Sequence, residues 1–486
     1  MKRKRMKTSL ELMKEVRSEW VINPVTRVHD NDTRKNAKKM RSEARRTVKK
    51  ALSEESRELF SCLRLACIIF ILLFSTVLYR ADAASLQTAD RLIDVNKLSA
   101  GFVTDLRYAT EDNFTGIKLY PSGICCLQED TAWKLAAANR ELQKKGLSIK
   151  IWDAYRPLSV QKKMWKLMPD SRYIANPYKN GSKHNRGAAV DVTLVDKNGK
   201  ELEMPSGFDD FSKRAIRNNP AMSAAAAKNL KLLTDAMTKN GFKAISTEWW
   251  HFDDTAYAVW PLLDISQEIV SRRLLPVEEL KCTGDSQQAI LVTSGSTSSS
   301  KAVLAAYEKT NGKWLKVLPD MKAFIGKNGF KKAKYEGDGC SPMGVFTIDT
   351  LFGWGPDPGF RLPYKPVTAD DYWVSSDKKE LYNVWINKKN GPDKSWTIYE
   401  RLKISEYKYA AIINYNNGPD RIPGNGSAIF LHKAGSKAYT SGCTAVAEAD
   451  LLNVLKWLKP DKEPVIIQGT LKELKELKQL RPLPVQ

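Results

Sequence analysis

Histidine is scarce in this chain, with four residues among 486, and cysteine is little used, with seven. Three of the four histidines lie in sharp local motifs, which makes them candidates for chemistry. A recognisable nucleic-acid-reading motif is missing, so we predict no nucleic-acid partner despite the net charge of +23. Internal repeats are missing too, so the two halves of the chain are unrelated.

The positive charge is concentrated at one end. Residues 1–64 form a basic arm with 19 Lys and Arg against 9 Asp and Glu. The remaining excess is spread over the rest of the chain without a concentrated block, and such a surface suits attraction to an anionic cell envelope.

Long apolar runs are limited to residues 65–79, which are uncharged. Fifteen residues are fewer than the roughly 20 that span a bilayer, and they fit a signal-peptide core better. The small residues Ala81 and Ala83 then complete a leader over 65–83. We therefore expect an exported protein of the periplasm or cell envelope. Two alternatives stay open: an uncleaved signal anchor, which would bring 65–79 into contact with the inner membrane, and a buried core helix.

Five cysteines follow this leader, and an odd number in an exported protein predicts at least one unpaired thiol. They are Cys125, Cys126, Cys282, Cys340 and Cys443.

Periodicity and turn signals predict two folded domains of different class. Residues 84–266 mix helices and strands and are expected to form an α+β domain, whereas 287–470 are mainly β. A charged linker over 267–286 joins them, and 471–486 form a charged tail. The expected helices are 128–145, 158–168, 223–239 and 450–458. The clearest strands expected in the first domain are 147–152, 188–195 and 243–252.

Residues of the first domain predict a catalytic zinc site with one ion per chain. His184, Asp191 and His251 would supply three ligands and leave the fourth position to water. Glu248 is placed to act as general base, and Arg156 to stabilise a negative oxygen. The plainer interpretation is a buried structural His or Asp, but an aspartate inside an apolar strand is costly unless it is paired or bound to metal.

One geometric difficulty accompanies this interpretation. In a regular strand Glu248 and His251 would point to opposite faces. The strand must bulge or end between them if both are to reach one metal.

Residues 95–255 resemble the D-alanyl-D-alanine dipeptidases of vancomycin-resistance systems (VanX type). The resemblance implies zinc on the three ligands above, Glu248 as base and Arg156 at the transition state. It further implies that Asp153, Ser182 and Asp209 help to hold a D-Ala-D-Ala dipeptide. Related D,D-carboxypeptidases share the metal ligands but leave the amino end open for a longer stem, so this alternative stays open. The matching text is DLRYAT (105–110), NFTG (113–116), DAYRP (153–157), SKHNRGAAVD (182–191), GFD (207–209) and EWWHF (248–252).

The second domain carries a candidate cysteine nucleophile. His432 lies eleven residues before Cys443, and an imidazole can draw a thiol proton to leave the reactive thiolate. Ser441 and Gly442 precede the thiol and would supply an oxyanion hole. A buried, inert cysteine is the alternative interpretation.

Residues 287–469 resemble the L,D-transpeptidase catalytic domain (YkuD type), which acts on peptidoglycan stem peptides. The resemblance implies Cys443 as nucleophile and His432 as base. Two departures are visible: the His-to-Cys spacing is short, and Ala445 stands where the family usually has arginine. A non-catalytic peptidoglycan-binding module therefore stays open. The matching text is DGCSPMGVFTI (338–348), GSAIFLH (426–432) and TSGCTAV (440–446).

Overall fold

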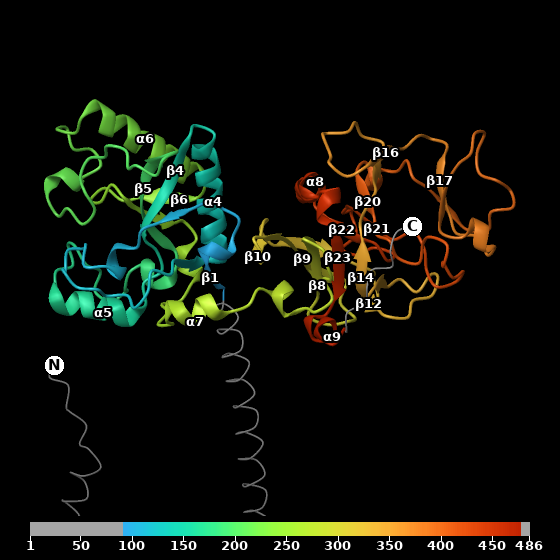
Figure 1. Cartoon of the computed structure of the whole chain (residues 1–486), viewed down its shortest axis with the longest axis horizontal. Coiled ribbons are helices and arrows are strands. Elements are labelled where there is room, and N and C mark those ends of the chain that lie inside the picture. Colours follow the sequence, from blue (N-terminus) through green and yellow to red (C-terminus); the bar gives the residue numbers. More distant parts are fainter. Residues whose placement is uncertain (1–90, 478–486) are drawn as a thin grey trace, which may run out of the picture. The chain divides into compact units, whose positions relative to one another are not determined.

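The computed structural model describes residues 91–477. The basic arm, the apolar run 65–79 and most of the charged tail lie outside the described residues. Among residues 91–477, no helix is long and apolar enough to cross a membrane. The described chain has a mixed α/β first part and a strand-rich second part (Figure 1).

A five-stranded sheet organises the first domain, in the order β2-β4-β5-β7-β6. Its first pair is parallel and the other neighbouring pairs are antiparallel. The strands are β2 (Val103–Thr104), β4 (Leu147–Asp153), β5 (Ala189–Asp196), β6 (Phe242–Ala244) and β7 (His251–Asp254).

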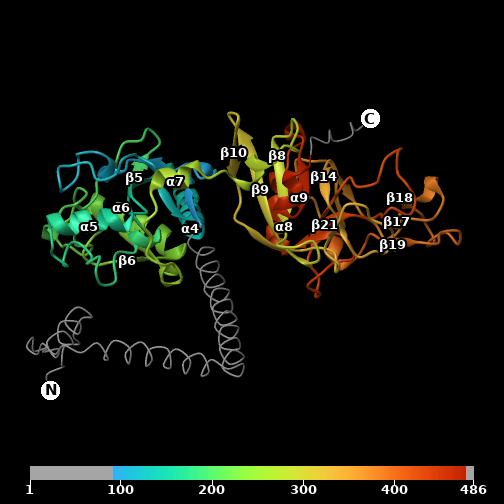
Figure 2. The ribbon, with the colours of Figure 1, turned by 90° about the horizontal axis from the view of Figure 1, so that it is seen from below.

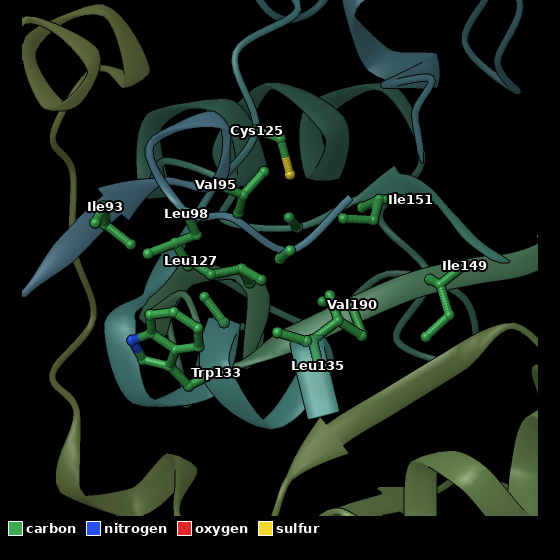
Figure 3. Packing of buried hydrophobic residues seen from close by; sticks show 14 of the residues in the cluster. Ile93, Val95, Leu98, Cys125, Leu127, Trp133, Leu135, Ile149, Ile151 and Val190 are labelled. Carbon is green, nitrogen blue, oxygen red and sulfur yellow. The ribbon is translucent and has the colours of Figure 1, made fainter. Parts of the chain in front are cut away.

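Helices cover this sheet where the sequence predicts them. They are α4 (Glu129–Gln143), α5 (Leu158–Leu167) and α6 (Ala224–Lys239). Ser223 caps α6 by accepting a hydrogen bond from the backbone of Ala226, as small polar residues commonly do at helix starts. Helices α4 and α6 contact each other and the sheet, and Leu135 of α4 belongs to the same buried cluster as Ile149, Ile151 and Val190 (Figure 3).

Two expectations for this region are wrong. The predicted single strand over 243–252 is two short strands, β6 and β7, separated by 245–250. The predicted irregular linker contains a helix, α7 (Gln267–Arg272), whose N-cap Ser266 accepts from the backbone of Ile269. The charged composition that suggested a linker is the exposed face of this helix and of the turn that follows.

An eleven-stranded sheet dominates the second domain, in the order β14-β23-β8-β9-β11-β22-β21-β20-β15-β16 with β10 beside β9. Strands β21 and β22 are adjacent and parallel, and they carry the candidate thiol site. Helix α8 (Glu448–Trp457) contacts β20 and β21. The strands are β8 (Gln288–Thr293), β9 (Lys301–Thr310), β10 (Lys313–Lys316), β11 (Met321–Phe324), β14 (Gly344–Thr347), β15 (Leu351–Gly353), β16 (Tyr364–Pro366), β20 (Ala410–Ile412), β21 (Phe430–Lys433), β22 (Thr444–Val446) and β23 (Val465–Gly469).

A separate three-stranded sheet lies between β16 and β20 in the sequence, in the order β18-β17-β19. In both views it occupies the end of this domain away from β10 (Figures 1 and 2). Tyr372, Val374 and Trp396 form a small hydrophobic core of their own there. The strands are β17 (Asp371–Val374), β18 (Val384–Asn387) and β19 (Tyr399–Arg401). The sequence analysis did not anticipate this sheet.

Candidate active sites

Three side chains of the first domain converge as the zinc interpretation requires. His184 begins a short 3-10 turn, Asp191 lies in β5, and His251 is the first residue of β7, directly beside Asp191 in the sheet. Nδ1 of His251 lies 3.0 Å from Oδ1 of Asp191 and 3.2 Å from Nε2 of His184. One ligand atom from each residue lies within 4.8 Å of the others, so the donor set and spacing fit a tetrahedral zinc.

The outer nitrogen of each imidazole is anchored by the protein. Nδ1 of His184 lies 2.7 Å from the carbonyl oxygen of Ala154, and Nε2 of His251 lies 2.8 Å from Oδ1 of Asp253. Such contacts fix the ring orientation and leave the inner nitrogen for a metal. The sequence analysis missed Asp253. Its signal was available, because residues two apart on a strand share a face.

Glu248 reaches the same centre because the predicted strand is interrupted. It lies in 245–250, and its Oε2 is 3.9 Å from Nδ1 of His251. Burial raises the pKa of the Glu248 carboxyl, which favours a base that works near neutral pH. Burial opposes ionisation of Asp191 as well, but there His184 and then His251 outweigh it and hold the pKa of Asp191 well below its usual range.

Arg217 ties this interrupted segment together. Its Nε donates to the carbonyl of Ile245 at 2.7 Å, and its Nη2 donates to the carbonyl of His251 at 3.0 Å. Its guanidinium also lies over the Phe252 ring, 4.3 Å from the centroid. One side chain therefore fixes both ends of the segment that carries Glu248.

Arg156 lines the same cavity as His184, Asp191 and His251, and residues outside the cavity lining hold its guanidinium in place. Its Nη2 donates to Oδ2 of Asp153 at 2.5 Å, and its Nη1 donates to Gln161 at 2.8 Å. Asp153 also accepts from the hydroxyl of Tyr120 at 2.6 Å and is fully buried. Asp153 is not among the residues that line the cavity, and both its oxygens accept hydrogen bonds inside the protein, where they support Arg156. That Asp153 helps to hold the dipeptide stays a prediction.

Ser182 and Asp209 do line the cavity, whose volume is about 240 Å³. The hydroxyl of Ser182 accepts from the backbone N–H of His184, so this residue also shapes the turn that presents the imidazole. Asp209 has a left-handed backbone, with φ of 57°, and accepts from the hydroxyl of Tyr108 at 3.0 Å and from the backbone N–H of Phe114. Burial raises the pKa of Asp209 to about 7.

The candidate thiol site lies in a cavity of about 500 Å³ in the second domain. His432 in β21 and Cys443, which precedes β22, both line it. Sγ of Cys443 donates to the carbonyl of Ala428 at 3.3 Å and accepts from the backbone N–H of Phe430. Nδ1 of His432 lies 2.8 Å from the carbonyl of Lys433, which leaves Nε2 as the basic nitrogen. Burial lowers the pKa of His432, so the ring is neutral at physiological pH.

The predicted oxyanion hole is only partly available. The backbone N–H of Gly442 donates to Oγ1 of Thr440 at 3.1 Å, so the prediction that it is free to bind an oxyanion is wrong. Ser441 lies exposed at the cavity wall. A side chain at Gly442 would meet the carbonyl of Cys340 at 3.0 Å, so glycine is required there by close packing.

A further carboxylate, Glu400 of β19, also lines the thiol cavity, and the sequence analysis missed it. Burial raises its pKa to about 7. Nothing in the local sequence marks Glu400, because the unanticipated three-stranded sheet brings it to Cys443.

Comparison with known proteins identifies two families in the chain. Residues 88–268 match the family described as D-ala-D-ala dipeptidase, and residues 297–467 match the L,D-transpeptidase catalytic domain. Both resemblances drawn from the sequence are thereby confirmed.

Curated relatives match the first domain. A D-alanyl-D-alanine dipeptidase of Escherichia coli is 39% identical over 172 residues, which are 35% of this chain and 89% of that protein. A D-alanyl-D-alanine dipeptidase of Enterococcus faecium is 29% identical over 178 residues, which are 32% of this chain and 88% of that protein.

Solved structures show weaker similarity. The helical cell shape determining protein Pgp2 of Campylobacter jejuni is 17% identical, with a TM-score of 0.23 and 40% of this chain covered. The chain spans about half of that structure, 54%. A vancomycin-resistance D,D-pentapeptidase is 12% identical with a TM-score of 0.19, covering 28% of this chain and 75% of that one.

Proposed function

The chain belongs to the D-alanyl-D-alanine dipeptidase family through residues 88–268 and carries an L,D-transpeptidase catalytic domain in 297–467, and from this premise we propose that it performs two reactions on peptidoglycan peptides. The first is zinc-dependent hydrolysis of D-Ala-D-Ala. The second is a cysteine-dependent acyl transfer on stem peptides. The convergence of His184, Asp191 and His251 beside Glu248 is the observation that carries the first proposal.

In the first domain, His184, Asp191 and His251 would hold the zinc. The ion would supply a Lewis acid and an acidic water. Glu248 takes the proton that the attacking water loses and returns it to the leaving amine. Arg156, fixed by Asp153 and Gln161, stabilises the negative charge that develops on the carbonyl oxygen.

Asp209 supports a dipeptide as the substrate. A free dipeptide carries an ammonium close to its scissile bond, and a carboxylate is the natural partner for it. Asp209 lines the same small cavity as Glu248 and Arg156, and contacts from Tyr108 and Phe114 fix its position. A longer stem has an amide at that point and would leave Asp209 without a cationic partner.

The experiment compares two substrates on the purified, zinc-loaded protein. Free D-Ala-D-Ala and a pentapeptide stem ending in D-Ala-D-Ala are incubated separately, and released D-alanine is measured. We expect release from the free dipeptide only, and none from either substrate with Glu248→Gln. Release from the stem and not from the dipeptide would refute the dipeptidase proposal.

A D,D-carboxypeptidase is the second candidate for this domain, and one observation favours it. A neighbouring cavity of about 440 Å³ shares Phe114 and Asp209 with the first. If Phe114 moved, the two cavities would join and accept a longer stem. The same substrate comparison separates the two candidates.

In the second domain, Cys443 attacks the carbonyl at the L-centre of a tetrapeptide stem while Nε2 of His432 takes the thiol proton. The thioester forms as the bond to D-alanine breaks, and His432 returns the proton to the leaving amine. An acceptor amine then attacks the thioester and restores the thiol. A shared cavity for both side chains supports this sequence.

The alternative for this domain is a peptidoglycan-binding module without chemistry. Defined muropeptides incubated with the full chain and with Cys443→Ala distinguish them. Product formation that disappears in the variant supports the transferase. Retained binding with no product in either protein would leave the binding module.

Export is proposed from the basic arm and the apolar run 65–79. A peptidoglycan enzyme needs access to the cell envelope, which this leader would provide. Fusion of residues 1–90 to a reporter that is active only outside the cytoplasm tests it, and an inactive reporter would refute export.

A further inference from the structure

Two backbone groups of the segment that leads into β21 hold the Cys443 sulfur. The thiol donates to the carbonyl of Ala428 at 3.3 Å, and the sulfur accepts from the N–H of Phe430 at 3.4 Å. Both contacts come from one short piece of chain. The position of the sulfur therefore depends on the backbone conformation of residues 428–430.

Ala428 has an unusual conformation within this segment. Its φ is 53°, in the left-handed region that residues with a β-carbon rarely adopt. A left-handed residue cannot continue an extended strand. Strand β21 accordingly begins only at Phe430, and the Ala428 carbonyl points to the sulfur. Such a backbone persists only where surrounding contacts hold it.

Asn383, directly before β18 of the three-stranded sheet, supplies a contact that holds Ala428. Its Oδ1 accepts from the backbone N–H of Ala428 at 2.9 Å and from Nε1 of Trp373 at 2.7 Å. Its Nδ2 donates to the carbonyls of Tyr415 and Asn416, at 3.1 and 2.7 Å. The amide is buried and uses both its donor hydrogens and both its acceptor positions, so its orientation is fixed.

We propose that Asn383 is a positioning residue for the candidate nucleophile: it holds Ala428 in the conformation that fixes the Cys443 sulfur. This inference rests on the proposed role of Cys443 as nucleophile. Asn383 is not among the residues that line the thiol cavity, so it acts on the sulfur through the backbone of Ala428 and not by touching the stem peptide.

A second residue of the three-stranded sheet supports the same segment. The ring of Trp373 stands edge-on to that of Phe430, with centroids 4.9 Å apart and planes at 82°. Asn383 and Trp373 thus support the two residues whose backbone groups contact the sulfur. His432 follows Phe430 by two residues in β21, so a shift of this segment would change the geometry of nucleophile and base together.

The test replaces Asn383 by glycine in the full chain. Glycine adopts the φ of 56° at this position without strain, so the substitution removes the side chain and leaves the local backbone permitted. We expect Asn383→Gly to lower kcat on a muropeptide with a tetrapeptide stem by about 10- to 100-fold, because a small misplacement of reacting groups slows the chemical step. KM should stay within about twofold, since Asn383 does not contact the substrate.

A crystal structure of the same variant gives a measurement that needs no turnover. We expect φ of Ala428 to become negative and the Ala428 carbonyl to move away from the Cys443 sulfur. Ala428→Val tests the same link without changing Asn383. A β-branched residue is strongly disfavoured at a φ of 53°, so kcat should fall by a similar factor.

Asn390→Gly is the matched control. Asn390 also has a left-handed backbone, with φ of 66°, and follows β18 in the same region, but it is exposed. Its replacement should change neither kcat nor the conformation of Ala428. Hydrolysis of D-Ala-D-Ala by the first domain should be equal in all variants, which provides an internal reference for the amount of intact protein.

The outcomes separate the positioning role from the proposed function. A kcat equal to that of the parent protein in either folded variant would overturn the proposal, as would an Asn383→Gly structure in which Ala428 keeps its φ and its contact with the sulfur. A displaced sulfur in Asn383→Gly, with no turnover of muropeptides by the parent protein, would uphold the positioning role and refute the transferase function.

Discussion

Asp253 offers the sharpest test of the proposed zinc site, because it would act on a bound ion through His251. Oδ1 of Asp253 lies 2.8 Å from Nε2 of His251, and Oδ2 lies 3.4 Å from Nζ of Lys183. Asp253→Asn keeps the size and one acceptor oxygen but removes the charge that increases imidazole basicity. Asp253→Ala removes both.

Loss of such an outer carboxylate weakens metal binding by about 10- to 100-fold. We therefore expect about tenfold weaker zinc binding for Asp253→Asn, close to 1.4 kcal/mol, and up to about 100-fold for Asp253→Ala. The loss of zinc affinity should be larger for Asp253→Ala than for Asp253→Asn, because asparagine keeps an acceptor oxygen beside His251 and alanine does not. This difference between the two variants tests the reasoning as directly as the size of either loss.

Competition with a chromogenic chelator measures zinc affinity in the full-length protein without requiring activity. Asp235→Asn, on the exposed face of α6 and paired only with Lys231, is the matched control. Affinities for both Asp253 variants within twofold of the parent protein would refute the reasoning.

Three further outcomes follow. Arg156→Lys should lower kcat for D-Ala-D-Ala by about 100-fold with unchanged zinc content, because lysine cannot replace the fork that Asp153 and Gln161 hold; unchanged steady-state kinetics would contradict this. Burial raises the pKa of Asp209 to about 7, so its carboxylate forms as pH rises through neutrality. KM for the dipeptide should therefore fall between about pH 6 and 8, and Asp209→Asn should remove that pH dependence. Ile151→Ala should lower the free energy of unfolding by about 2–5 kcal/mol in urea titrations, because this side chain of β4 is fully buried in the core; a loss below about 1 kcal/mol would contradict this.

The convergence of His184, Asp191 and His251 was predictable from local sequence, because their motifs are short and lie in or beside two neighbouring strands. The helices α4, α5 and α6 were also predictable from the periodicity of their apolar residues and from the charges and turn residues at their ends. The break at 245–250 was anticipated only as a chemical requirement of Glu248 and His251. The sequence shows no breaker there, and the tertiary contacts of Arg217 hold the segment open.

Two residues show where local reasoning ended. Asp153 lies at a register shift that follows Ile151 in the pairing of β4 with β5, and such an irregularity re-aims a side chain in a way that periodicity does not reveal. Glu400 arrives at the thiol from an inserted sheet, and non-local placement of this kind leaves no mark on the neighbouring sequence.

The two backbone hydrogen bonds of Arg217 limit which sequence changes the first domain can accept around Glu248. The Arg217 guanidinium donates hydrogen bonds to the backbone carbonyls of Ile245 and His251. The segment between these two residues can therefore change in length or conformation only if both carbonyls keep their positions. Glu248 and His251 therefore form one structural unit with Arg217. Transfer of this segment to a related protein would require transfer of Arg217 as well.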